Sequence, residues 1–186
     1  MFRILLLATV FLSACAGADQ RFLIDSAPAP EAKTMRLRVS TLEVREVSLP
    51  AYAEDSQILL EDADGALTPA EGALWADEPV RAVTLLLVDQ IGRTSNATVA
   101  AEPWPLETPA QAAVHVRVSE MVARASGTFD LKGQFAISSY EQVVRERIKR
   151  FEISVPLKAT TPAGIAQASG AAMQQLASEI LKELSR

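Results

Sequence analysis

The chain has 186 residues, of which 18 are basic and 23 acidic, for a net charge of −5. This acidic balance argues against nucleic acid as a partner and against broad attraction to anionic lipid, since both carry negative charge. A single cysteine excludes an intramolecular disulfide. The chain also has only one histidine, so no second cysteine or histidine is present for a transition-metal site.

The first 14 residues have the composition of a secretory signal. Arg3 is the only charged residue among them, and an almost unbroken apolar run follows it from Ile4 to Leu12. This run is too short to cross a bilayer as a helix, which takes about 20 apolar residues. We therefore expect residues 1–14 to be a signal peptide that is removed on export.

The end of this segment is more specific than its beginning. Leu12-Ser13-Ala14-Cys15 places a branched apolar residue and two small residues before the only cysteine, which is the pattern of a lipobox. The sequence therefore predicts cleavage before Cys15 and lipid attachment to its thiol. A lipidated N-terminus and short tether over residues 15–20 would lead into one folded domain over residues 21–186. An ordinary signal peptide with a chance cysteine is the alternative.

Alternating apolar and polar residues predict three strands in the first part of the domain. The first is short, at residues 22–24. The second covers residues 35–49, with two predicted bulges where the apolar set shifts in phase, and it ends at Pro50. The third covers residues 57–60, and the composition of residues 62–65 then predicts a turn.

Thr68-Pro69-Ala70-Glu71 has the residues that commonly begin a helix, namely a capping Thr, a first-turn Pro and a Glu at the third position. A second proline, Pro79, interrupts a single long helix. We therefore expect the main helix to restart with Asp77 as its cap and to end at Gly92. Its apolar face is predicted from residues at helical spacing: Val80, Val83, Leu87 and Ile91.

The second half of the chain contains the clearest β-pattern. After a short strand at residues 96–100, valines alternate with polar residues from 114 to 122, a turn follows at 124–127, and alternation resumes over residues 129–137. A further strand is predicted at about residues 147–155. Thr161-Pro162 then begins an amphipathic helix with apolar residues every four positions: Ala168, Ala172, Leu176, Ile180 and Leu184.

These elements predict a single α+β domain, with an antiparallel or mixed sheet and two amphipathic helices packed on one face. Known catalytic patterns are missing from the sequence. His115, the only histidine, falls on the polar side of a strand, and no nucleophile elbow, phosphate loop or HExxH pair is present. We therefore expect no catalytic residues, no metal site and no cofactor.

Two features have alternative interpretations. Trp104 lies between two prolines in a loop, where it either packs at the edge of the core, the default, or presents an aromatic side chain to a partner. The basic run at residues 145–150 either contacts lipid headgroups or an acidic partner, or protects a strand edge from unwanted pairing.

Three motifs and a helix follow one another in a characteristic order. Leu49-Pro50-Ala51-Tyr52 precedes Ser56-Gln57-Ile58, then Leu74-Trp75-Ala76-Asp77-Glu78-Pro79, and an Ala-rich helix over residues 167–177 closes the chain. In this order and spacing the sequence resembles the ABC-type transport auxiliary lipoproteins, the PqiC-like family. Ala53 and Asp77 depart from the family's pattern, in which a Leu commonly follows the Tyr and a Glu follows the Trp-Ala pair.

The resemblance implies a non-catalytic docking component of an MCE/ABC-type system that moves lipids or other hydrophobic compounds between the inner and outer membranes. Its partners would be an MCE-domain protein and the ABC transporter, with the lipid anchor holding it to the membrane. Some members assemble as rings, so a homo-oligomeric ring is among the implied arrangements. The predicted partner-binding residues are Pro50, Tyr52, Gln57 and Trp75, with fold-determining packing as their alternative role.

Ala16, rather than Asp, follows Cys15, and this favours the periplasmic face of the outer membrane. Two other functions stay open at this point. One is a lipoprotein that assists assembly of an outer-membrane machine. The other is a periplasmic hydrolase or free-standing ligand-binding lipoprotein, for which the sequence offers no set of residues to line a pocket.

Overall fold

The computed structural model describes residues 19–24 and 34–185. The predicted signal peptide, Cys15 and most of the loop at residues 26–34 therefore lie outside the described residues. The elements in chain order are β1 (Gln20–Phe22), β2 (Thr41–Val44), α1 (Ala51–Glu54), β3 (Gln57–Glu61), β4 (Leu67–Trp75), α2 (Pro79–Thr94), β5 (Thr98–Ala101), β6 (Ala112–Ala123), β7 (Thr128–Ser138), β8 (Arg147–Pro156) and α3 (Pro162–Leu184).

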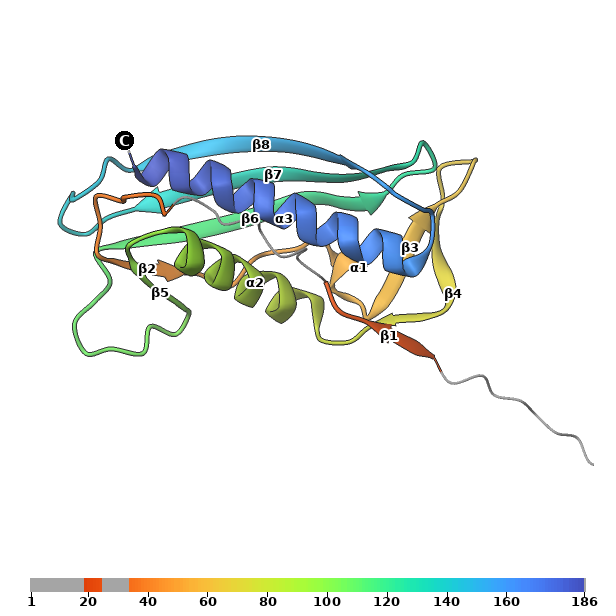
Figure 1. Ribbon diagram of the computed structural model, residues 1–186, viewed down its shortest axis with the longest axis horizontal. Helices are drawn as coiled ribbons and strands as arrows, with labels where there is room; N and C mark the ends of the chain where they lie inside the picture. Colours follow the sequence, from red (N-terminus) through yellow and green to blue (C-terminus); the bar gives the residue numbers. More distant parts are fainter. Residues whose placement is uncertain (1–18, 25–33, 186) are drawn as a thin grey trace, which may run out of the picture.

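Strand β6 is the centre of the sheet (Figure 1). One of its edges pairs with β7 in antiparallel register from Ala113 to Ala123, and β7 pairs in the same way with β8. Its other edge is shared, because β2 pairs with residues 112–114 and β3 pairs at Ala123, both in parallel. Beyond these, β5 extends the sheet from β2, and β4 and β1 extend it from β3. The predicted mixed sheet in a single α+β domain is confirmed.

Helices α2 and α3 lie next to each other across one face of the sheet (Figure 1), as predicted. The side chain of Thr161 caps α3 by accepting the N–H of Gly164 at 3.2 Å, which confirms the cap expected there. Each helix buries one apolar stripe, and full burial of such side chains contributes about 1.5–3 kcal/mol each. The stripes include Val83, Leu87 and Ile91 of α2, and Ala172, Leu176, Ile180 and Leu184 of α3.

The helix predicted to begin at Thr68-Pro69 is wrong, because these residues belong to strand β4. The predicted turn at residues 62–65 folds the chain back, so that β4 pairs antiparallel with β3 and Thr68 lies opposite Leu60. The Thr68 hydroxyl donates to the carbonyl of Leu60 at 3.2 Å instead of capping a helix. Strand β1 reaches only residues 73–75 of β4, so Pro69 has no second neighbour that would need its missing N–H.

The bounds of α2 also differ from those predicted. Its N-cap is Glu78 rather than Asp77, and its last residue is Thr94 rather than Gly92. Asp77 still contributes at this end, since its carboxylate accepts the N–H of Glu78 at 2.9 Å and pairs with Arg81 one turn later. Gly92 therefore lies inside α2 and does not end the helix, because the backbone of Gly92 stays in the right-handed helical region.

The predicted strand at residues 35–49 shortens to the four residues of β2. On either side, Met35 and Ser48 make isolated bridges to Ser95 and Arg117. After the strand, α1 forms a single helical turn that the sequence did not predict, with Pro50 at its N-cap. The segment changes neighbours along its length, so its alternation did not correspond to one continuous ladder.

Gly133 of β7 lies next to a bulge in β6 between Val118 and Glu120. It pairs with Val118 of β6 on one side and with Phe151 of β8 on the other. A Cβ at position 133 would lie 2.2 Å from the carbonyl oxygen of Arg117 and 2.9 Å from the Phe151 ring. Backbone cannot yield as a flexible side chain does, so only glycine fits here.

We therefore expect Gly133→Ala to lower the free energy of unfolding by about 1–3 kcal/mol, the usual range for overpacking, as measured by urea denaturation. Gly92→Ala is the matched control. A Cβ there would meet only the Val99 side chain at 3.9 Å, and alanine is about 1 kcal/mol better than glycine in a helix. Equal stability of Gly133→Ala and the unmodified chain would contradict the argument.

Candidate functional site

Three of the four predicted partner-binding residues meet where β3 approaches β6. Tyr52, Gln57 and Trp75 line one cavity of about 20 Å³, together with side chains that include Phe129 and Ile165. A space of this size holds at most about one water molecule. Pro50 lies outside the cavity lining, half-buried at the N-cap of α1. The junction is therefore a packed seam between elements and has no room for a small-molecule ligand.

Tyr52 bridges a gap along one edge of β6. On this edge the pairing with β2 stops at Val114, and the pairing with β3 occurs at Ala123. Between them, the phenol oxygen of Tyr52 accepts the backbone N–H of Met121 at 3.1 Å. Leaving a buried backbone donor without a partner costs about 1–3 kcal/mol, so this hydroxyl has a structural role in the sheet.

Trp75 and Gln57 differ in their exposure to solvent. Trp75 is only 6 % exposed, and its backbone N–H donates to the carbonyl of Ser56 at 2.7 Å. Gln57 is exposed at the start of β3. Packing therefore accounts for Trp75 and for much of Tyr52, while Gln57 is the member of this group whose side chain is available to a partner.

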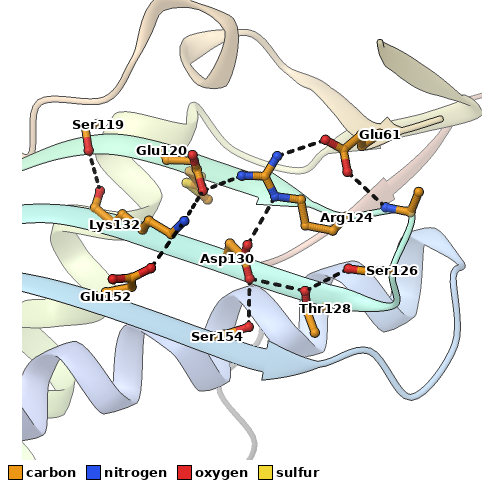
Figure 2. A network of polar contacts seen from close by, with 12 residues as sticks. Glu61, Ser119, Glu120, Arg124, Ser126, Thr128, Asp130, Lys132, Glu152 and Ser154 are labelled. Atoms are coloured by element: carbon orange, nitrogen blue, oxygen red, sulfur yellow. Dashed lines mark hydrogen bonds and ion pairs between the residues drawn. The ribbon is translucent and has the colours of Figure 1, made fainter. Parts of the chain in front are cut away.

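Beside this seam, a polar network joins the ends of β3, β6 and β7 (Figure 2). Its centre is Arg124, the residue that follows β6, whose side chain is 25 % exposed. The guanidinium lies 2.8 Å from Glu61, 2.5 Å from Glu120 and 3.1 Å from Asp130. One cation thus contacts carboxylates from three strands, which ties β3 to the β6–β7 hairpin. No sequence motif indicated this network, because its members are brought together by strand pairing.

A second cation continues the network across the exposed face of the hairpin. Lys132 lies 3.2 Å from Glu120 and 3.4 Å from Glu152, and thereby links β6, β7 and β8. Asp130 also accepts the hydroxyl of Ser154 at 2.7 Å. Each side chain named here is therefore bonded to a neighbouring strand (Figure 2).

The protonation of these groups follows from their contacts. Burial acts to raise the pKa of Glu120, but hydrogen bonds from Arg124 and Lys132 outweigh it and hold that pKa below its ordinary value. Burial also acts to raise the pKa of Asp130. Hydrogen bonds from Ser154 and Arg124 outweigh this effect, so the pKa of Asp130 is lowered. The hydrogen bond to Glu120 is the largest cause that raises the pKa of Arg124. These groups stay charged near neutral pH and serve structure rather than proton transfer.

The one histidine of the chain has no triad-like arrangement around it among the described residues. His115 Nε2 lies 3.2 Å from Ser138 Oγ on the exposed face of the hairpin, and within the described chain no carboxylate is bonded to the ring to orient it as a base. Residues 19–24 and 34–185 contain no group of three or more His, Cys, Asp or Glu placed to hold a metal ion. No helix among them is long and apolar enough to span a membrane.

The structure also locates Trp104 and the basic run at residues 145–150. Trp104 is half-buried in the loop between β5 and β6, so it is neither a core residue nor fully exposed. The basic run at residues 145–150 leads into strand β8, which among the described residues pairs with β7 alone and is an edge of the sheet. Arg147 and Lys149 turn toward α3, where they lie 2.6 and 3.9 Å from Glu183. This placement agrees with protection of a strand edge.

The geometry defines an α+β domain in which a mixed sheet is covered on one face by two helices and ionic networks join neighbouring strands. The sequence matches the family of ABC-type transport auxiliary lipoprotein components over residues 22–181. The chain belongs to this family. No curated protein matches the chain in a sequence comparison.

Two crystal structures share the fold. One, of an uncharacterised protein, superposes with a TM-score of 0.68 at 18 % identity and covers 83 % of this chain and all of its own. The other, of a Xanthomonas campestris protein from the DUF330 family, has a TM-score of 0.61 at 16 % identity and covers 88 % of this chain and 91 % of its own. At these identities the likeness extends to the fold alone.

The Arg124 network generates a stability prediction. Replacing Arg124 with Met leaves Glu61 and Asp130 without their cation and Glu120 with Lys132 alone, so we expect a loss of about 1–3 kcal/mol in the free energy of unfolding at pH 7. Because the pKa values of Glu120 and Asp130 are lowered in the folded state, this stabilisation is present above the ordinary carboxyl range and is lost as the pH falls below about 4. Urea denaturation should therefore show a smaller difference in the free energy of unfolding between Arg124→Met and the unmodified chain at pH 3.5 than at pH 7.

Arg93→Met is the matched control for this experiment. Arg93 pairs with Asp89 at 2.7 Å, but the two side chains are 77 % and 45 % exposed. An exposed pair of this kind contributes about 0.5 kcal/mol or less. Similar losses for the two arginine variants, or a difference independent of pH, would contradict a structural role for Arg124.

Proposed function

We propose that this chain is lipidated at Cys15 and acts, without catalysis, as a docking component of an MCE/ABC-type system that transports lipids or other hydrophobic compounds. Its site of action would be the periplasmic face of the outer membrane. The observation that carries the proposal is membership of the transport auxiliary lipoprotein family over residues 22–181, in a chain whose lipobox cysteine lies seven residues before that match.

The position of β1 supports a domain held close to the bilayer. Four residues lie between Cys15 and Gln20, the first residue of β1, so their Cα atoms are five residue steps apart. A chain of this length reaches at most about 18 Å. Strand β1 pairs with β4 through three residue pairs, and the N–H of Ala76 donates to the carbonyl of Phe22 at 2.8 Å. A lipid on Cys15 would therefore restrain the whole sheet and not merely a flexible terminus.

The long axis of the sheet then supports an orientation. Strand β1 lies at one end of the domain, and the C-terminal end of α3, the β5–β6 loop and the turn after β7 lie at the opposite end (Figure 1). With β1 next to the bilayer, the opposite end would project into the periplasm, where an MCE-domain protein and its ABC transporter would approach. Several copies arranged side by side on the membrane would form the ring that the family resemblance implies.

The lipid anchor is tested by Cys15→Ser. We expect the variant to accumulate as the uncleaved precursor and to lose incorporation of labelled fatty acid, because the thioether cannot form. Fractionation of labelled cells, with the unmodified chain as control, measures both. Normal maturation of the variant would rule out Cys15 as the site of lipid attachment.

The transport assignment is tested by isolating the lipidated chain from its native envelope in mild detergent and identifying co-purifying proteins by mass spectrometry. We expect recovery of an MCE-domain protein or the ABC transporter of the same system. Recovery of a barrel protein alone would favour a role in outer-membrane assembly. Recovery of no protein across several detergents would favour a free-standing ligand-binding lipoprotein.

The β3–β6 seam can be separated into packing and binding contributions in the same assay. Gln57→Ala should leave the free energy of unfolding within about 0.5 kcal/mol of the original, because the side chain is exposed, and should lower partner recovery if this surface is in contact. Tyr52→Ala should lower stability as well, by removing the acceptor of the Met121 N–H. Unchanged recovery with Gln57→Ala would leave packing as the role of this group.

A further inference from the structure

A groove of about 630 Å³ is lined by residues of the β5–β6 loop and of the turn that follows β7. Both segments lie at the end of the sheet opposite β1 (Figure 1). We call it the Trp104 groove, with Trp104, Leu106 and Tyr140 on its walls and Glu43 and Arg45 among its polar lining. Leu106 is 55 % exposed and Tyr140 is 82 % exposed, although both are large hydrophobic residues. Adjacent exposed apolar side chains beside a hollow are typical of an interaction surface.

One wall of the groove is held by a buried carboxylate. Glu43 of β2 is only 7 % exposed and accepts the backbone N–H of Trp104 at 3.1 Å. The same carboxylate pairs with Arg45 at 3.1 Å, and Arg45 also lies 2.6 Å from Glu102. The indole N–H of Trp104 donates to the carbonyl of Thr108 at 2.8 Å, which closes the loop on itself.

The second wall is joined to the first through Gln111, at the end of the same loop. The hydroxyl of Ser139 donates to the Gln111 carbonyl at 2.8 Å, and the backbone N–H of Ser40 donates to its side-chain oxygen at 2.7 Å. These bonds fix the relative positions of the loop and the turn that carries Tyr140. A surface fixed before binding loses little conformational entropy when a partner docks.

The charge of the groove indicates what would fill it. Arg45 is already neutralised by its two carboxylates, while Glu107 and Glu141 on the rim make no ion pair within the described part of the chain. The surplus charge is negative, so an anionic headgroup is disfavoured. A lipid tail would in turn bury the charged Glu43–Arg45–Glu102 cluster against hydrocarbon, which is unfavourable. A partner segment in which an apolar side chain lies next to a cationic one would complement both the apolar walls and the negatively charged rim of the groove.

We infer that the Trp104 groove docks a peptide segment of a partner protein in which an apolar side chain lies next to a Lys or Arg. This inference rests on the proposed function, under which the end opposite β1 points away from the membrane and toward the transport partner. The apolar side chain would lie between Trp104, Leu106 and Tyr140. The cation would lie at Glu107 and Glu141.

The test uses a photo-crosslinking amino acid in place of Tyr140 in the full lipidated chain, irradiated in its native envelope. The same amino acid in place of Leu85, a 41 % exposed residue of α2, is the control. We expect an adduct from position 140 and none from position 85. Mass spectrometry of the adduct should identify one partner peptide with an apolar residue beside a Lys or Arg.

Charge reversal on the rim tests the cation. Glu107→Lys together with Glu141→Lys should lower the yield of the adduct roughly tenfold, which corresponds to two exposed charge contacts. Glu54→Lys together with Glu71→Lys changes the net charge equally at exposed positions away from the groove and should leave the yield unchanged. Equal yields from the two double variants would overturn the role of Glu107 and Glu141.

The remaining outcomes separate the two proposals. An adduct to lipid, or to another copy of this chain, would overturn the inferred occupant. Co-purification of a transport protein without an adduct at position 140 would overturn the groove while leaving the proposed function in place. An adduct to a matching peptide of a protein outside any transport system would support the groove and contradict the proposed function. If no transport protein co-purifies and no adduct forms at position 140, the result would count against both proposals.

Discussion

The structure depends on how the two edges of β6 are satisfied. One edge is paired with β7 from Ala113 to Ala123, but the other is divided between β2 at its start and β3 at its end. Every unpaired N–H or carbonyl on a central strand costs free energy, so the division creates places where something other than a strand must supply a partner. Residues 45–48 and Tyr52 supply it, through the bonds of Arg45, Ser48 and Tyr52 to β6.

The polar side chains of the domain follow from this constraint. Arg124 and Glu61 join the ends of β6 and β3, where only one residue pair, Leu60 with Ala123, belongs to the ladder. Glu43 and Arg45 perform a similar task at the other end of the sheet, where they hold the β5–β6 loop. These two ionic groups thus lie at the two ends of the divided edge of β6, and they stiffen both ends of the domain.

A stiff domain with differentiated ends suits docking. The end that carries β1 follows closely on the predicted lipid attachment, and its groups are packed or paired, as the 20 Å³ cavity beside Tyr52 and the Arg124 network illustrate. The opposite end exposes Leu106 and Tyr140 beside an open groove. Because both ends belong to one continuous sheet, a contact made at the groove would be held at a defined height and angle relative to the membrane.

Local patterns alone were sufficient for several features. Alternation over residues 114–122, 129–137 and 147–155 predicted three strands, and the four-residue apolar spacing predicted α3, because each of these elements has one buried and one more solvated face over much of its length. The lipobox pattern and the ordered motifs could likewise be identified without knowledge of the fold. The Thr68-Pro69 segment failed because its partner, β3, lies across a turn, and pairing outweighed a local preference for helix.

Only the tertiary structure decided which residues meet. Tyr52 and Met121, Arg124 and Glu61, and Glu43 and Trp104 are each separated by about 60 or more positions, and no spacing in the sequence relates them. The sequence by itself determined the family and the repeating elements, and it predicted the export signal, because these depend on neighbouring residues and their periodicity. The seam, the ionic network and the groove depend on which strand lies beside β6, and that follows from the burial and pairing of the whole sheet.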